Sequence, residues 1–382
     1  MNMKERLNQI LHPETKRQVF LLAFGVNLIL AALVFIPFTA AHGGIFALCE
    51  DFAGETLPYR YLARDAIRSG DIFWNWNLDL GSDFMQSFGA SWFLDPFKLI
   101  PTLLPESMML TCSAWLMILR YAVAGGAMGL YLRRHFDSRG VWLTGSVMYA
   151  FCGFQATILV FDMLSDVSVF FPFYMTAMEE LVEENKKGRY AFWVFYLACM
   201  SVTMFVNVFV FSIIWFLFIY GEKTKEFFIR MGKCIGEGIL GGMMALISIL
   251  PTIYAILGDS RASLKLTGAG ALTFDSTRVM FLIKGWLFPS ESMSNISSIY
   301  TAEWMTVSAY LPLVSILLLL AYCHKHGSDR MAKLMKFLVV MSFIPFLNNL
   351  FMMESLEPYC RWYFMMLFSA VIISCRVIND YR

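Results

Sequence analysis

The segment from residue 50 to residue 68 holds acidic and basic side chains that could act on a hydroxyl group or a phosphate. Glu50 and Asp51 are adjacent, and a carboxylate can serve as a general base toward a hydroxyl group. Arginines recur every four residues on one face of a helix expected over 57–69, at Arg60, Arg64 and Arg68. Guanidinium groups match phosphate geometry, so this face fits either a substrate phosphate or the headgroups of ordinary lipids beside an interfacial helix.

Ionisable residues also interrupt the apolar runs of the chain. Arg120 lies midway along one run, where a charge needs a carboxylate, a lipid phosphate or a water-filled cavity. Asp162 and Asp166, at the end of the next run, are four residues apart and can share a helix face. They could bind a divalent metal, hold a sugar hydroxyl or simply face water. Arg361 begins the last run, where the helix dipole opposes a cation and an anionic partner is expected.

Aromatic and amide side chains follow the arginine-bearing helix in the segment Trp74-Asn75-Trp76-Asn77. Two interpretations fit: an aromatic belt at a membrane surface, or a surface on which a sugar ring stacks. The chain contains no G-x-x-x-x-G-K-[ST], H-E-x-x-H or G-x-S-x-G motif, so nucleotide-binding loops, zinc proteases and serine hydrolases of those types find no support.

The composition places these residues in a membrane protein. Hydrophobic residues make up 58% of the 382-residue chain, charged residues make up 15%, and the mean hydropathy is +0.60. Soluble domains are less apolar and more highly charged. The formal net charge of +1 gives no reason to expect nucleic acid as a partner.

The apolar runs predict an all-α, polytopic integral membrane protein with about ten transmembrane helices and a single transmembrane domain over 1–382. Two of the runs could instead form one hairpin of half-length helices around Asn207, and the first run could be a signal peptide. The ten runs are 19–41, 108–132, 140–160, 167–182, 190–205, 206–220, 234–256, 304–323, 335–352 and 360–376.

The loops between these runs alternate between short basic segments and longer acidic ones. By the positive-inside rule, the basic segments and both termini, including residues 1–18, are cytoplasmic. Two long loops, 42–107 and 257–303, then lie outside the cell membrane, where a binding site is expected.

Several motifs, taken in their order along the chain, resemble the YfhO family of bacterial membrane proteins, which is assigned to the GT-C superfamily of lipid-dependent glycosyltransferases. Pro358-Tyr359-Cys360-Arg361 resembles a Pro-Tyr-Arg motif of that family with one inserted residue. The other matching features are Asp51, the helix over 57–69, Trp74-Asn75, Leu80-Gly81, Pro96-Phe97, the Arg120 region 119–125, the segment 149–154 with Asp166 and Phe171-Pro172 after it, and Ser260-Arg261.

The resemblance implies a GT-C-like fold and an inverting enzyme that transfers a sugar from a polyprenyl-phosphate donor to a cell-envelope acceptor, such as lipoteichoic acid, on the outer face of the bacterial plasma membrane. Asp51 would act as general base, with Glu50 beside it, and a divalent cation, Mg²⁺ or Mn²⁺, could bind at Asp51 and Asp166. The expected contacts to lipid phosphate and sugar are Arg60, Arg64, Trp74, Asn75, Arg120, Asp162, Asp166, Arg261 and Arg361.

The chain is shorter than is usual in the family, which suggests a short variant, a fragment or half of a split protein. Two other functions remain open on the sequence. One is a transporter or flippase of lipid-linked intermediates, and the other is a non-catalytic membrane partner of a longer homologue.

Overall fold

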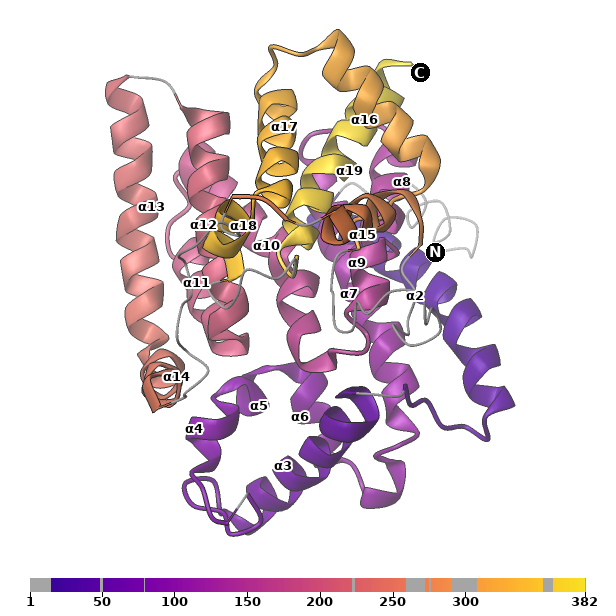
Figure 1. The fold of residues 1–382 in the computed structure, drawn as a ribbon, viewed down its shortest axis with the longest axis vertical. Helices are drawn as coiled ribbons and strands as arrows, with labels where there is room; N and C mark the ends of the chain where they lie inside the picture. Colours follow the sequence, from indigo (N-terminus) through magenta and orange to yellow (C-terminus); the bar gives the residue numbers. More distant parts are fainter. Residues whose placement is uncertain are drawn as a thin grey trace.

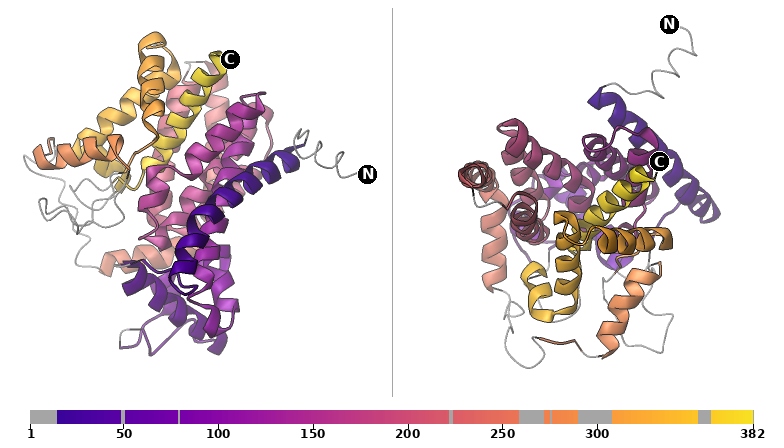
Figure 2. Two further views of the ribbon diagram at one scale, coloured as in Figure 1. Left: turned by 90° about the vertical axis from the view of Figure 1, so that its right-hand side faces the viewer. Right: turned by 90° about the horizontal axis from the view of Figure 1, so that it is seen from above.

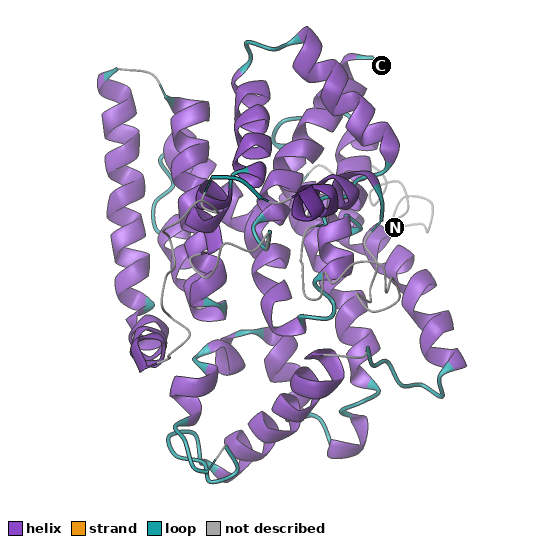
Figure 3. Ribbon diagram, viewed as in Figure 1, coloured by secondary structure: helices purple, strands orange, loops and turns teal. Residues whose placement is uncertain are grey.

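Helices form nearly all of the regular structure in the computed structural model, which describes residues 15–48, 51–78, 80–221, 224–258, 272–274, 276–289, 308–352 and 360–381. Within these ranges the only β-type pairing is an isolated bridge between Asn75 and Ser82 (Figure 3). The prediction of an all-α fold is confirmed.

All ten predicted runs overlap helices, but several of these helices are shorter than a membrane crossing needs. Among the described residues, four helices are long and apolar enough to span a membrane, or up to six if each of two bent pairs counts as one span. The predicted number of ten is therefore not confirmed. The helices that overlap the runs are α2 (Lys16–Ala41), α7 (Cys112–Arg133), α8 (Arg139–Ala150), α9 (Gly153–Thr157), α10 (Asp162–Glu184), α11 (Arg189–Met200), α12 (Val202–Tyr220), α13 (Lys225–Met244), α14 (Leu246–Gly258), α16 (Leu313–Lys325), α17 (Arg330–Phe343), α18 (Pro345–Met352) and α19 (Tyr363–Asp380).

Several helices end at a polar residue or at a bend that the hydropathy of the sequence does not predict. The alternative in which two of the runs turn around Asn207 is wrong, because Asn207 lies buried inside α12 and the break falls at Ser201. Ser201 has an extended backbone, and its hydroxyl accepts a hydrogen bond from the amide of Met204, which caps α12. The bent pairs are α13–α14, with an angle of 71°, and α17–α18, with an angle of 108°.

Short helices fill the first long loop, residues 42–107. They are η1 (Phe52–Thr56), α3 (Leu57–Ser69), α4 (Phe84–Phe88), α5 (Ser91–Leu94), α6 (Pro96–Leu103) and η2 (Glu106–Met108). α3 coincides with the helix predicted over 57–69. It ends at Gly70, whose φ of +85° favours glycine. A further helix outside the predicted runs is α15 (Ser276–Leu287).

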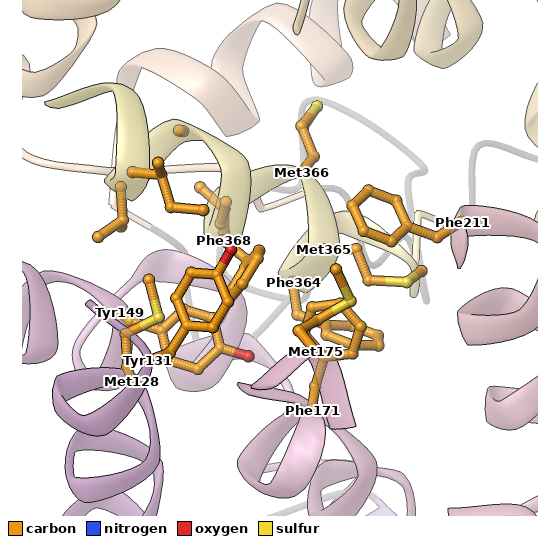
Figure 4. Packing of buried hydrophobic residues seen from close by; sticks show 14 of the residues in the cluster. Met128, Tyr131, Tyr149, Phe171, Met175, Phe211, Phe364, Met365, Met366 and Phe368 are labelled. Carbon is orange, nitrogen blue, oxygen red and sulfur yellow. The ribbon is translucent and has the colours of Figure 1, made fainter. Parts of the chain in front are cut away.

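The centre of the bundle is a dense aromatic and methionine core on α19 and its neighbours (Figure 4). The Phe171 ring of α10 lies 5.2 Å from that of Phe364 and 5.1 Å from that of Phe368, and Tyr131 of α7 lies 4.6 Å from Phe368. α2 packs closely along α7, and the lack of a side chain at Gly125 allows this approach. A Cβ at that position would lie only 2.1 Å from Asn27 Nδ2. Figure 2 shows α2 along the outside of the bundle.

The helices of the first loop gather at one end of the molecule, the lower end in Figure 1, and the turn between α16 and α17 lies at the opposite end. We call these the loop end and the basic end. Side-chain contacts connect the six predicted cytoplasmic segments, or the helix ends beside them, at the basic end: Lys16–Glu180, Arg134–Glu184, Tyr220–Glu183, Arg330 to the carbonyl of Ile219, and Arg376–Asp329. The segments that were predicted to share a membrane face thus lie together.

Candidate functional site

A buried ion pair joins α7 to the loop end of α10. The guanidinium group of Arg120 donates from Nε to Asp166 Oδ1 at 2.7 Å and from Nη2 to Asp166 Oδ2 at 3.2 Å. Both side chains are at most 3% exposed, and the guanidinium lies 5.0 Å from the centre of the Phe97 ring. Of the three partners considered for Arg120, the structure shows the carboxylate. The interpretation in which Asp166 simply faces water is wrong, because Asp166 is buried.

The first loop adds a second carboxyl group and a lysine to this pair. Asp95 begins α6, where its Oδ1 accepts a hydrogen bond from the amide of Phe97 at 2.9 Å. The ammonium group of Lys98, one turn later, lies 3.9 Å from Asp95 Oδ2. Asp95 is fully buried and Lys98 is 6% exposed, so α6 carries both side chains into the interior.

Asp95 and Asp166 affect each other's protonation, because two neighbouring carboxyl groups in the interior do not readily both carry a charge. Burial and the neighbouring carboxylate of Asp166 raise the pKa of Asp95 well above the usual aspartate value, although Lys98 and Arg120 oppose the shift. Arg120 engages both oxygens of Asp166 and so favours its ionised form, which leaves Asp95 as the carboxyl group that favours the protonated form.

Arg60 completes a charge cluster that we define as Arg60, Asp95, Lys98, Arg120 and Asp166. Arg60 is 2% exposed, donates from Nη1 to the hydroxyl of Ser113 at 2.9 Å and lies 5.7 Å from the centre of the Phe52 ring. Burial lowers its pKa, and Asp166 and Asp95 partly offset this effect. A buried guanidinium cannot contact lipid headgroups at the surface, so that interpretation is wrong for Arg60.

A polar pocket of about 530 Å³ opens beside the charge cluster. Lys98 is the member of the cluster that lines it. Hydroxyl, amide and aromatic groups make up much of the remaining wall, and this mixture suits a ligand with many hydroxyl groups. The wall comes from the first loop (Glu55, Tyr59, Leu78, Gln86, Ser87, Phe88, Gly89, Ser91, Trp92), the α11–α12 junction (Cys199, Met200, Ser201, Val202, Thr203) and α14 (Ser248, Thr252, Ala255).

The predicted base Asp51 lies close to this pocket. It is partly buried at the start of η1. Burial raises the pKa of Tyr59, and the negative charges of Glu55 and Asp51 raise it further. Asp51 begins η1, and Glu55 of the same short helix lines the pocket, so Asp51 lies on the segment that leads to its rim.

The other arginines on the predicted face of α3 bind protein groups. Arg64 Nε lies 3.4 Å from the carbonyl oxygen of Leu104, and Arg68 Nη2 donates to the same oxygen at 3.1 Å. That carbonyl follows the end of α6, where cations are favoured. These arginines fasten α3 to α6 and so hold the first loop in shape.

Three predicted ligand-binding residues lie apart from these contacts. Trp74 is 52% exposed and packs edge-on against Trp76 at 5.5 Å. Asn75 is buried, and its side chain accepts a hydrogen bond from the amide of Asn77, so it shapes the local turn. Arg361 lies 5.8 Å from the centre of the Phe161 ring, next to the start of α10.

Glu50, Arg261 and the side chain of Asp162 lie outside the described residues. Among the residues that are described, no group of three or more His, Cys, Asp or Glu side chains could hold a metal ion. Both oxygens of Asp166 are already engaged by Arg120, so this pair of residues does not fit the metal site predicted for Asp51 and Asp166.

Sequence reasoning missed Asp95 and Lys98. The signal was an Asp-Pro pair at the start of a helix, which reads as a cap, followed by a lysine within the first turn. Nothing in that pattern shows that α6 points into the protein. Only the folded first loop reveals that these charges meet Arg120 and Asp166.

Comparisons with known proteins give one match. No curated protein and no solved structure matches the chain. A family model described as bacterial membrane protein YfhO matches residues 23–382. With nearly the whole chain matched and helices able to cross a membrane, the protein is a membrane protein that belongs to the YfhO family.

Proposed function

We propose that this protein is a membrane glycosyltransferase that moves a sugar from a polyprenyl-phosphate donor to a cell-envelope acceptor. In this proposal the loop end faces the outside of the bacterial plasma membrane, and the basic end and both termini are cytoplasmic. The observation that supports it best is the buried charge cluster beside a polar pocket at the loop end.

The charge cluster favours an anionic ligand. It contains three cationic side chains and two carboxyl groups, and the raised pKa of Asp95 favours its neutral form, which removes one negative charge. Buried groups lose the screening of water, so this excess of positive charge acts strongly on a nearby phosphate. Lys98 delivers it, because its side chain reaches the pocket. A departing lipid phosphate gains negative charge as the bond to the sugar breaks, so Lys98 would stabilise the transition state.

The rim supplies the remaining chemistry. Asp51 would take the proton from the acceptor hydroxyl as it attacks the sugar. Tyr59, Phe88 and Trp92 offer flat surfaces against which a sugar ring can pack, and the hydroxyl groups around the pocket can bond its oxygens. The residues described do not define a metal site, so no step is assigned to a divalent cation.

The first test measures transfer of labelled sugar from polyprenyl-phosphate donors by the full chain in vesicles. Asp51→Asn keeps the size of the side chain and removes the base, so transfer should be lost while the protein stays folded. Asp65→Asn, at an exposed carboxylate of α3, is the matched control and should transfer normally. Normal transfer by Asp51→Asn, or none by folded wild-type protein with any donor, would reject the proposal.

Lys98→Met tests the anion contact. The change keeps the length of the side chain, and the neighbouring Asp95 stays neutral, so folding should be little affected. We expect transfer to fall about 100-fold or more, as for removal of other groups that stabilise developing negative charge. Lys98→Arg should recover part of the rate. An unchanged rate in Lys98→Met would assign the phosphate to another cation.

A further inference from the structure

A crevice separates α8 from α16 at the basic end, the opposite end of the molecule from the charge cluster. Both helices pack against α19, but in the described part of the chain they have little direct contact with each other (Figure 1). α8 approaches α19 closely at Gly145, where a Cβ would lie 2.5 Å from the sulfur of Cys375. The adjacent residue Thr144 is exposed and borders the crevice.

The crevice consists of two adjoining cavities that follow α8. The first, of about 930 Å³, lies at the start of α8, and the second, of about 360 Å³, extends along α8 as far as Phe151. Thr144 lines both cavities, so they are continuous. The second cavity is apolar, with Val147 and Met148 on one side and Pro312, at the start of α16, on the other.

Charge is confined to the opening of the crevice at the basic end. Arg139 and Ser138 line the first cavity there, together with Tyr381 from the end of α19. The ammonium group of Lys325, the last residue of α16, lies 5.9 Å from the centre of the Tyr381 ring. No acidic residue of the described chain lines either cavity. The opening is therefore positively charged, whereas the far end of the crevice is hydrocarbon.

The length of the crevice corresponds to one leaflet of a membrane. α8 has 12 residues, which gives about 18 Å at the usual helical rise. The hydrocarbon core of a bilayer is about 30 Å thick, so one leaflet contributes about 15 Å. A molecule with its head at Arg139 would reach the middle of the bilayer near Phe151. Basic pockets between membrane helices are a known type of site for anionic lipid headgroups.

We propose that this crevice binds one anionic phospholipid from the leaflet that borders the basic end. The phosphate lies at Arg139 and Ser138, and an acyl chain follows α8 past Val147 to Phe151. A zwitterionic phospholipid would bring a cationic group towards Arg139 and Lys325, so the site selects a net negative headgroup. The bound lipid fills the space between α8 and α16 and so connects two helices that have little direct contact.

The experiment uses the full chain in phosphatidylcholine vesicles that contain a trace of phosphatidylglycerol with a photoreactive diazirine in its acyl chain. After illumination, mass spectrometry of peptides maps the labelled residues. We expect α8 to be labelled about fivefold more than α13, because one cation near an anionic lipid contributes about that factor in affinity. α13 reports ordinary lipid contact, since Ile235 and Leu240 are about half exposed there.

Phosphatidylcholine that carries the same photoreactive chain should label α8 and α13 alike. Equal labelling of α8 by the two lipids would overturn the inference, and this comparison needs no variant. An excess of glycerol 3-phosphate should leave the labelling unchanged. Loss of labelling in its presence would assign the opening to a soluble phosphate compound and would overturn the lipid assignment.

Arg139→Gln tests the headgroup contact. It should lower labelling of α8 by phosphatidylglycerol to the level seen with phosphatidylcholine, and Arg139→Lys, which keeps the charge, should retain most of the preference. Arg133→Gln is the matched control, because Arg133 is a partly exposed arginine of the basic end that pairs with Asp137 and lies outside the crevice. A preference that survives in Arg139→Gln would contradict the proposal.

Discussion

The two ends of α10 carry charge clusters that differ in burial. At the loop end, Asp166 is paired with Arg120, and both side chains are almost completely buried. At the basic end, Glu180 is also buried, but it is surrounded by cations that reach it from solvent. Lys16, Lys186 and Arg189 are 57%, 43% and 59% exposed, and Arg134 is the fourth cation of this set.

The difference in burial indicates different roles for the two clusters: the basic end holds helices together, and the loop end is the candidate functional site. Exposed cations keep most of their hydration, so the basic end ties α2, α7 and α11 to α10 at little cost. The charge cluster at the loop end carries the full cost of desolvation, and hydrophobic residues of similar size would generally be at least as stable there. A costly arrangement beside a pocket is typical of a functional site.

The largest loss of unfolding free energy should come from removing one partner of the buried Arg120–Asp166 pair. Asp166→Asn leaves the Arg120 guanidinium buried without a counter-charge, which should cost about 3–5 kcal/mol of unfolding free energy. The matched change at the basic end, Glu183→Gln, removes an exposed carboxylate and should cost less than about 1 kcal/mol. Denaturant unfolding in detergent compares the two. Similar losses would contradict the distinction between the ends.

Replacing the whole pair sharpens the comparison. In the double variant Arg120→Met with Asp166→Leu the guanidinium is removed together with its carboxylate, so most of the stability lost in Asp166→Asn should return. Sugar transfer should not return, because the packing around Asp95 and Lys98 has been altered. A variant that is stable and fully active would show that the pair is only structural.

The raised pKa of Asp95 predicts a pH dependence of the unfolding free energy that is of intermediate size. Because its pKa is raised in the folded protein, Asp95 keeps its proton at pH values where the unfolded chain has released it. Its contribution to stability is therefore complete below about pH 4 and is lost as the pH rises through the raised pKa.

Asp95→Asn mimics the protonated form and should flatten this fall in unfolding free energy above about pH 4. Asp65→Asn, at an exposed site, serves as the control and should follow the wild-type curve. A wild-type curve that rises with pH in this range, in parallel with that of Asp95→Asn, would place the proton elsewhere.

Local patterns predicted much of the fold. The helix over 57–69 was predictable because Pro58 falls in its first turn and Gly70 ends it. The basic segments were predictable as one face of the protein because charge placement in loops is a local signal. The breaks at Ser201 and between α13 and α14 were not, since both lie inside continuous apolar sequence.

The candidate site was predictable only in part. Arg120 and Asp166 stand out as charges among apolar residues, and each is now seen to be the partner of the other. Arg64 and Arg68 were misleading because an arginine stripe fits a helix C-terminus as well as a phosphate. Asp95 and Lys98 could not be predicted, because their burial depends on how the first loop folds over α7 and α10.

The smallest expected effect belongs to Glu184 at the basic end. Hydrogen bonds from Lys186 and Arg134 lower its pKa to about 2. The stability that it contributes is therefore complete above about pH 4 and is lost as the pH falls through about 2.

Glu184→Gln should remove less than about 1 kcal/mol at neutral pH, and the difference from wild type should shrink in high salt because these side chains are partly exposed. The loss caused by Asp166→Asn should be nearly independent of salt, since ions cannot reach the buried pair. Equal salt sensitivity at both sites would mean that solvent reaches Arg120 and Asp166, and the loop end would then be a second fastening rather than a site.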